Sequence, residues 1–398
     1  MAVSIEGAAA PVQRDPNAVP RQAVVKLRAG LYNHRSMAVT VRSFAKINLG
    51  LRIGAAREDG FHELLTVYQT IGLHDVIQVS VLRGAGIEIR CADPRVPRDE
   101  SNTCFRIVER AMTALRAKGR VVIEIEKRLP VQGGLGGASA NAVAALLALE
   151  RSVRKLLTQA EKLRIAADVG SDLPLFLVGG TVLGVGRGEQ VYPLPDFPAT
   201  ACVVVTPEIG VSTPNAFAEW DRLCGAGAPA REGSIHPSFA EGSAPKPTEL
   251  RSAGQPLAAV PTQGTTKLTM PAGSDRMNEL SRSLSAWLGG LYSSAPSRLE
   301  GRGRAGNPLL RLDRAGIEND FEQVVFPEYP KLGEAKRALV RAGAKYASLS
   351  GSGSTLYGLF ASRQAASSAV TKLRKAGWVA RATTALTRAG YWRRMWAE

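Results

Sequence analysis

The amino-acid sequence predicts an α+β fold organised as two domains. Its 398 residues are 45% hydrophobic and 22% charged, enough to bury two cores of ordinary domain size. Glycine is abundant, at 40 residues, whereas aromatic residues make up only 6%. This balance suits a mixed fold with tight backbone turns better than a helical bundle. Segments with the alternating period of strands and segments with the helical period follow one another along the chain.

The N-terminal domain is expected over residues 37–199. β-branched residues in near alternation predict a first strand at 38–52, and a helical pattern beginning at 105 ends at Gly119. Alternation is clear again at 121–126, which runs through a loop rich in proline and glycine into an alanine-rich helix. The other expected elements of this domain are strands at 75–82, 86–90 and 180–185 and helices at 140–150 and 158–167.

The C-terminal domain is expected over residues 200–398. A strand at 201–206 opens it, and an ordered pattern resumes at 316 and continues to a last helix and strand with a basic tail. Between these segments, Ser, Pro, Gly and Ala dominate at about 223–306. This composition predicts a disordered or loosely packed insertion, with one short helical piece at 275–292.

Composition narrows the classes of function. The formal net charge is +16, but Lys and Arg are scattered, which favours solubility and phosphate-rich small ligands over nucleic acid. The four cysteines are far apart, so neither a disulfide framework nor a zinc site is expected, and a reducing cytoplasm fits. No apolar run reaches the length of a membrane span. Residues 1–36 are expected to be a basic flexible extension; a transit peptide and a misplaced start ahead of Met37 remain open.

The strongest chemical signal is the glycine-rich loop between a predicted strand and a predicted helix. A triphosphate must approach backbone amides closely, which a Cβ would block, and this order of elements places amides at a helix N-terminus. Ser139 could cap the helix, contact a phosphate or help to hold magnesium. A flexible turn is the alternative, and the Gly-Lys ending of a P-loop is missing. The predicted ATP-binding residues of the loop are Pro130, Val131, Gln132, Gly133, Gly134, Leu135, Gly136, Gly137, Ala138, Ser139 and Ala140.

Several other residues have both a chemical and a structural interpretation. Lys46 lies in a strand among apolar neighbours, where a charge needs a partner, unless it is a surface lysine on an edge strand. Asp172, just ahead of a Leu-Pro pair, would also serve as an ordinary helix N-cap. His62 could be a turn-associated surface histidine, and Phe217 a core residue. The run Ser350–Ser354, placed between a helix and an apolar strand, predicts a tight turn rather than a linker.

Three segments stand out together because of their order. They are SFAKINLGLRIGAAREDGFHEL (43–64), LPVQGGLGGASANA (129–142) and LSGSGSTLYG (349–358). In this order they resemble the three motifs of the galactokinase–homoserine kinase–mevalonate kinase superfamily. AKINL followed by Asp-Gly-Phe-His, together with GSDLPLF and STPNAF, resembles more closely the kinases of 4-diphosphocytidyl-2-C-methyl-D-erythritol, over 38 to about 220 and 316 to about 390.

The resemblance implies a fold and an activity. The fold is a two-domain small-molecule kinase, with a ribosomal-S5-like N-terminal domain, a ferredoxin-like α/β C-terminal domain and an active site between them. The activity is ATP-dependent phosphorylation of the 2-hydroxyl of the cytidyl substrate, in the non-mevalonate route to isopentenyl diphosphate, with ATP and Mg²⁺ as cofactors. The only partner expected is this small molecule, without nucleic acid or membrane, and the chain would be a monomer or homodimer.

The resemblance also implies roles for individual residues. Asp172 would be the catalytic base or orienting carboxylate and Lys46 its cationic partner, because an ammonium stabilises charge on the carboxylate and on the attacking oxygen. Phe61 and Phe217 would clamp the cytosine ring by stacking, and His62 would contact its polar edge. The substrate-binding set is Asn48, Phe61, His62, Thr213 and Phe217, and Asn102, Lys127 and Asn141 would lie near the nucleotide.

The chain departs from the family pattern at four positions. Phe61 stands where tyrosine is frequent, so a phenol hydrogen bond is lost while stacking survives. Gln132 and Ala138 replace loop glycines, and Ala140 replaces a serine, each adding or changing a side chain near the phosphates. No acidic residue stands out as a magnesium ligand, so the metal ligands stay unknown.

Two other functions remain open on the sequence. Another kinase of the superfamily, of the homoserine or mevalonate type, would keep the glycine loop and Asp172 but not the Phe-His pair at 61–62. A non-catalytic RNA-binding protein would need a stripe of Lys and Arg with salt-sensitive affinity, and it leaves the loop and Asp172 unexplained.

Overall fold

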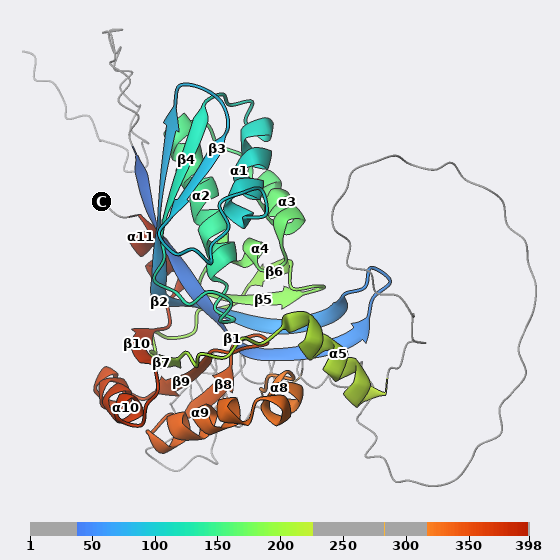
Figure 1. Ribbon diagram of the computed structural model, residues 1–398, viewed down its shortest axis with the longest axis vertical. Coiled ribbons are helices and arrows are strands. Elements are labelled where there is room, and N and C mark those ends of the chain that lie inside the picture. Colours follow the sequence, from blue (N-terminus) through green and yellow to red (C-terminus); the bar gives the residue numbers. More distant parts are fainter. Residues whose placement is uncertain (1–37, 226–281, 283–316, 397–398) are drawn as a thin grey trace, which may run out of the picture. The chain divides into compact units, whose positions relative to one another are not determined.

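Two β-sheets form the framework of the chain (Figure 1). The computed structural model describes residues 38–225, Arg282 and residues 317–396, all within one unit. The predicted extension at 1–36, and the predicted insertion at 223–306 with its helical piece, lie outside the described residues except for 223–225 and Arg282.

The first sheet has the strand order β3-β4-β2-β5-β6, with β1 paired to β2. Its strands are β1 Val39–Ala56, β2 His62–Leu82, β3 Ile87–Cys91, β4 Arg120–Glu126, β5 Thr181–Val185 and β6 Gln190–Pro193. β1 and β2 form one long antiparallel hairpin, so the strand predicted at 75–82 is only the end of β2. Its pairing slips between Phe44 and Lys46 and again between Asn48 and Gly50. Such irregularities re-aim side chains, here around Lys46 and Asn48.

Helices cover one face of the first sheet (Figure 1). They are α1 Thr103–Ala114, α2 Gly137–Val153, α3 Gln159–Val169 and the short α4 Leu173–Phe176. α2 packs directly on β1 and β2, and every residue from Ala140 to Glu150 is buried. This explains its small, apolar composition, because a helix enclosed on all sides has no polar face. The helix predicted to reach Gly119 ends earlier, at Ala114, and is followed by a turn.

The second sheet is antiparallel, with the strand order β10-β7-β9-β8. Its strands are β7 Ala201–Val205, β8 Tyr346–Leu349, β9 Leu356–Phe360 and β10 Ala380–Thr384. α9 and α10 pack on this sheet. The helices of this part are α5 Thr213–Cys224, α8 Glu322–Glu328, α9 Pro330–Arg341, α10 Arg363–Lys375 and α11 Arg388–Met395. The basic tail predicted after the last strand is therefore the helix α11, which returns to β1.

The two sheets share a core and a set of main-chain contacts. Ile47 and Leu49 of β1 belong to one buried cluster with Val204 and Tyr357 of the second sheet. The Tyr357 hydroxyl donates to the carbonyl of Asn48, at 2.7 Å. Because these contacts reach the middle of β1, the second sheet is anchored within a few residues of Lys46.

Candidate active site

The glycine-rich loop joins β4 to α2, as predicted from the order of elements. Gly136 is the N-cap of α2, with φ of 67°, and no side chain caps the helix. The first amides of α2 therefore lack a capping partner from a side chain, which leaves the helix start suited to an anion. Gln132 also takes a positive φ, of 58°, where glycine would be less strained.

The loop lines a cavity of about 380 Å³, within the range of small-molecule sites. Asn102, Lys127 and Asn141, which the resemblance placed near the nucleotide, line it as well. Of the eleven loop residues predicted to bind ATP, Pro130 through Ser139 line the cavity, whereas Ala140 is buried beneath it. A cradle of main-chain amides at a helix start, open to a cavity of this size, fits a nucleotide triphosphate.

One buried carboxylate that the sequence reasoning missed holds this site together. Asp75 is 0% exposed and accepts hydrogen bonds from Lys127 Nζ at 2.6 Å and Asn141 Nδ2 at 3.0 Å. It also accepts from the amides of Arg128 and Leu129, both at 2.7 Å. The Oδ1 atom of Asn141 is buried without a hydrogen-bond partner among the described residues. Asp75 thus fixes two cavity-lining side chains, Lys127 and Asn141.

Lys46 and Asp172 meet beside the loop, although 126 positions separate them in the sequence. Lys46 Nζ lies 3.3 Å from Asp172 Oδ2, and the lysine is only 4% exposed. The Lys46 amide donates to the carbonyl of Leu135 at 3.0 Å, and a Cβ at Gly136 would lie 3.0 Å from Lys46 Cγ. The Asp172 side chain makes no helix-capping bond in α4, so the N-cap interpretation does not account for it.

The side chain of Asn48 is hydrogen-bonded to Lys46 and helps to hold it in place. Lys46 Nζ donates to Asn48 Oδ1 at 2.8 Å, and Asn48 Nδ2 donates to Thr66 Oγ1 at 2.8 Å. Asn48 and Thr66 are buried, so this chain of hydrogen bonds restricts the ammonium to the side of β1 that faces Asp172. The predicted contact of Asn48 with substrate stays a prediction.

The Ser350–Ser354 turn locks onto the glycine-rich loop. The Ser350 hydroxyl donates to the carbonyl of Gly134 at 2.9 Å, and the Thr355 amide donates to the carbonyl of Gly133 at 3.2 Å. A Cβ at Gly134 would overlap the carbonyl oxygen of Ser350. The predicted tight turn therefore packs against the glycine-rich loop, and Gly134 has to be glycine because the two backbones are in contact there.

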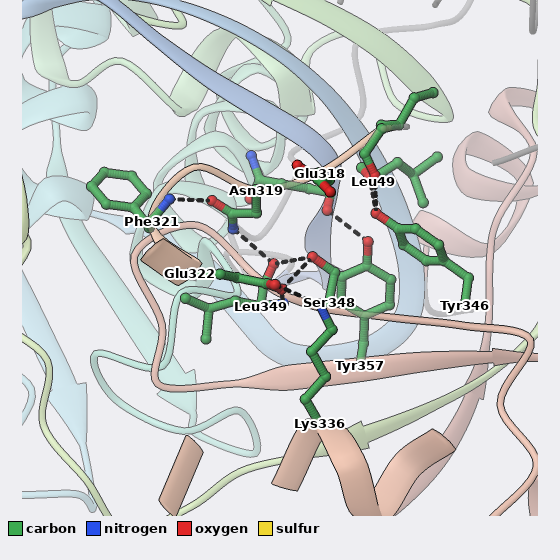
Figure 2. A network of polar contacts seen from close by, with 12 residues as sticks. Leu49, Glu318, Asn319, Phe321, Glu322, Lys336, Tyr346, Ser348, Leu349 and Tyr357 are labelled. Atoms are coloured by element: carbon green, nitrogen blue, oxygen red, sulfur yellow. Dashed lines mark hydrogen bonds and ion pairs between the residues drawn. The ribbon is translucent and has the colours of Figure 1, made fainter. Parts of the chain in front are cut away.

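The turn is held from behind by two side chains that the sequence reasoning did not single out (Figure 2). Asn319 Nδ2 donates to the carbonyls of Leu349 and Gly351, at 2.9 and 2.8 Å. Glu322 Oε1 accepts from the Ser348 hydroxyl at 2.9 Å and from the Leu349 amide at 2.8 Å. Because three of these four contacts are to main-chain groups at or just before the start of the turn, they fix its position against the loop.

Replacing Gly134 with alanine is expected to raise the KM for ATP about tenfold or more, since a Cβ would force the loop off the Ser350 turn and misplace its amides. Gly377→Ala is the matched control. Its φ of 84° resembles the 74° of Gly134, but a Cβ there meets nothing within 4 Å. Equal KM values in both variants would show that the backbone contact with the turn is unimportant; steady-state kinetics decide this.

The residues predicted to bind the cytidyl group gather at the start of β2 and on α5. The rings of His62 and Phe217 are stacked, with centroids 4.9 Å apart and planes 12° from parallel. His62 Nε2 lies 2.7 Å from Asp221 Oδ1 of α5. Phe61 is 51% exposed, with the Arg187 guanidinium 5.0 Å from its ring centre. The aromatic rings predicted to clamp the cytosine therefore lie in one region, and in this structure Phe217 is stacked on His62.

Thr213 connects the start of α5 to the same turn. Its hydroxyl lies 2.7 Å from that of Ser352, within the Ser350–Ser354 turn. Together with the contacts of Lys46 and Ser350 to the glycine-rich loop, this brings parts of all three sequence segments into one region of the structure.

Within the described ranges, no group of three or more His, Cys, Asp and Glu side chains could hold a metal ion. Nor does any helix of the described part combine the length and the hydropathy that crossing a bilayer requires.

Comparison with known proteins agrees with this geometry. The model of the GHMP kinase N-terminal domain matches residues 102–180, and that of the GHMP kinase C-terminal domain matches residues 302–378. A crystal structure of L. major mevalonate kinase superposes with a TM-score of 0.59, covering 88% of this chain and 96% of that one, at 14% identity, which shows the shared fold. The fold and site thus define an ATP-dependent kinase of the GHMP class, as the sequence predicted.

Similar proteins show to which family within the GHMP kinases this chain belongs. The chain is 36% identical over 325 residues to a 4-diphosphocytidyl-2-C-methyl-D-erythritol kinase of Solibacter usitatus, covering 82% of each protein. It is 33% identical to the enzyme so named from Acaryochloris marina, covering 85% of this chain and 92% of that protein. A crystal structure of 4-(cytidine 5'-diphospho)-2C-methyl-D-erythritol kinase superposes with a TM-score of 0.57 at 25% identity, covering 87% and 98%. The chain belongs to the 4-diphosphocytidyl-2-C-methyl-D-erythritol kinase family.

Proposed function

We propose that the protein transfers the γ-phosphoryl group of ATP to the 2-hydroxyl of 4-diphosphocytidyl-2-C-methyl-D-erythritol. The observation that carries the proposal is the Lys46–Asp172 pair, 3.3 Å apart, beside the glycine-rich loop. Phosphoryl transfer needs positioning and charge neutralisation, which a buried ammonium, a carboxylate and a cradle of amides supply. Membership of the family supports the choice of acceptor.

The reaction would proceed in one displacement. The acceptor hydroxyl loses its proton to Asp172 as its oxygen bonds to the γ-phosphorus, and the bond from that phosphorus to the bridging oxygen breaks to release ADP. Lys46 stabilises the negative charge that develops on the attacking oxygen. Because Lys46 is 4% exposed, its charge acts with little screening by water.

Magnesium is expected to accompany ATP. The ion prefers phosphate oxygens and water with one or two protein oxygens, and the hydroxyl of Ser139, which lines the cavity at the start of α2, fits that preference. When bound, the ion would neutralise part of the phosphate charge. The loop amides would contribute further positive character around the same phosphates, and Lys127, paired with Asp75, lines the cavity beside them.

The cytidyl group would bind where His62, Phe61 and Phe217 gather. Stacking between two aromatic rings suits a pyrimidine, and the imidazole offers a hydrogen bond to its polar edge. Binding would require Phe217 to leave the face of His62, on which it is stacked at 4.9 Å. The exposed ring of Phe61 is already open to a ligand.

We further propose that the protein works in the cytoplasm, in the non-mevalonate route to isopentenyl diphosphate, without a nucleic-acid partner and as a monomer or homodimer. Cys91, Cys104 and Cys202 are buried as free thiols, which suits a reducing compartment.

A coupled assay of ADP release, with cytidyl, homoserine and mevalonate substrates in parallel, tests the proposed acceptor. Turnover is expected with the cytidyl substrate alone, and phosphorus NMR of the product should place the new phosphate on the 2-hydroxyl. Preference for homoserine or mevalonate, or failure to turn over any of the three, would refute the assignment.

His62→Ala is expected to raise the KM for the cytidyl substrate about tenfold, because the hydrogen bond to the polar edge of the cytosine is lost, while the KM for ATP stays constant. His74→Ala is the control; His74 makes an edge contact with Phe44 and bonds the carbonyl of Gly72, outside the proposed cytidyl site. A parallel rise of both KM values in His62→Ala would indicate general damage instead of lost recognition.

A further inference from the structure

Asp172 has a second donor that the proposed mechanism does not use. The hydroxyl of Tyr68 donates to Asp172 Oδ1 at 3.1 Å, while Lys46 Nζ lies 3.3 Å from Oδ2. Tyr68 comes from β2 and Lys46 from β1, so donors from two adjacent strands hold one carboxylate oxygen each. Two fixed donors on the two oxygens define the plane of the carboxylate as well as its position.

Two glycines, Gly184 and Gly188, leave the space that the Tyr68 side chain occupies. Tyr68 is 2% exposed and pairs with Asn48 on one side and Val182 on the other. A Cβ at Gly184 would overlap the tyrosine ring, and a Cβ at Gly188 would overlap its hydroxyl. The hydroxyl is therefore enclosed between the β5–β6 hairpin and Asp172.

The charges around the phenol keep it a donor. Burial, then the negative charge of Asp172, raise the pKa of Tyr68 well above its ordinary value, and Glu189 adds to the effect from the β5–β6 hairpin. Lys46 Nζ lies 5.6 Å from the ring centre of Tyr68 and forms its ion pair with Asp172. At any pH at which a kinase works, the hydroxyl carries its proton and donates it toward the carboxylate.

We propose that Tyr68 is a positioning residue for phosphoryl transfer, holding the Asp172 carboxylate so that its free lone pairs face the acceptor hydroxyl. The inference rests on the proposed role of Asp172. The side chain of Asp172 is 32% exposed, so without a second donor it could rotate about the single contact with Lys46. Misorientation of a reacting group slows the chemical step without changing the binding of either substrate.

Tyr68→Phe tests the proposal, because it removes only the hydroxyl. We expect kcat to fall about tenfold, with the KM values for ATP and for the cytidyl substrate unchanged within about twofold. Tyr391→Phe is the matched control. It removes a buried hydroxyl that donates to the carbonyl of Phe176 in α4 at 2.7 Å, so it should lower the melting temperature and leave kcat alone.

A double-mutant cycle separates this inference from the function on which it rests. In an Asp172→Asn background, Tyr68→Phe should have no further effect on the residual rate, since the carboxylate it positions is gone. Gly188→Ala, which crowds the hydroxyl with the tyrosine retained, should reproduce the loss of kcat. An unchanged kcat in Tyr68→Phe, with Asp172→Asn still inactive, would overturn the role of Tyr68 alone; an active Asp172→Asn enzyme would overturn the mechanism beneath it.

Discussion

Replacing Asp172 with asparagine is expected to lower kcat about 10³-fold, with the protein folded and both substrates bound. Asparagine keeps the shape of the side chain and can still bond the Tyr68 hydroxyl, but it cannot accept the proton of the acceptor alcohol. It also removes the negative charge that faces Lys46 at 3.3 Å. The loss should therefore appear in kcat, while the KM for ATP changes little.

Asp168→Asn is the matched control for this substitution. Asp168 lies on α3 in an exposed ion pair with Arg164, at 3.7 Å, and is expected to have no part in the reaction. Exposed pairs of this kind contribute little to stability, so this variant should match the unmodified enzyme. Comparable turnover in the two variants would mean that Asp172 is dispensable, and the proposed mechanism would be wrong.

Replacing Lys46 with methionine is expected to lower kcat about 10²-fold, because the reaction loses the cation nearest the attacking oxygen. Methionine fills the buried space of the lysine stem, which limits any packing defect. Removing the ammonium leaves Asn48 Oδ1 without the donor that lies 2.8 Å away. Stopped-flow measurement of ADP formation in a single turnover separates this loss in the chemical step from any change in product release.

Lys162→Met controls for the loss of a partly buried ion pair. Lys162 lies 3.3 Å from Glu150, the same separation as in the Lys46–Asp172 pair, but between α3 and α2. It should lower the melting temperature without lowering kcat. The double variant Lys46→Met, Asp172→Asn should be no slower than Asp172→Asn alone, since the two residues act as a unit. Strictly additive losses would argue that they act separately.

Much of the fold was predictable because the chain alternates clear strand and helix periods. The order of strand, loop and helix correctly placed a helix N-terminus at the end of the glycine-rich loop, and phosphate binding there stays a prediction. The bounds of the elements shifted: α2 spans Gly137–Val153 instead of 140–150, and α1 ends at Ala114. The start of β2 at His62 was missed, because polar residues interrupt the apolar alternation there. The helix α11 was missed because its basic composition hides the buried Tyr391 and Met395.

The sequence singled out the motif residues of the candidate site and missed the residues that support them. Asp75 and Tyr68 form hydrogen bonds with side chains more than 50 positions away in the sequence. Asn319 donates to a main-chain carbonyl next to the Ser350–Ser354 turn, 30 positions away. No local sequence pattern predicts that these residues support the site. In the sequence, Asp75 is a polar residue at the start of a predicted strand, and Tyr68 has no feature that sets it apart from its neighbours. Register across the β1–β2 hairpin and crossing contacts between the sheets decide these positions, and both depend on the whole fold.

A crystal structure of the ternary complex with the cytidyl substrate and a non-hydrolysable ATP analogue is the most direct measurement. The account predicts the γ-phosphorus at the start of α2, with the substrate 2-hydroxyl in line with it and hydrogen-bonded to Asp172. A nucleotide bound away from the glycine-rich loop, or a 2-hydroxyl out of reach of Asp172, would contradict it.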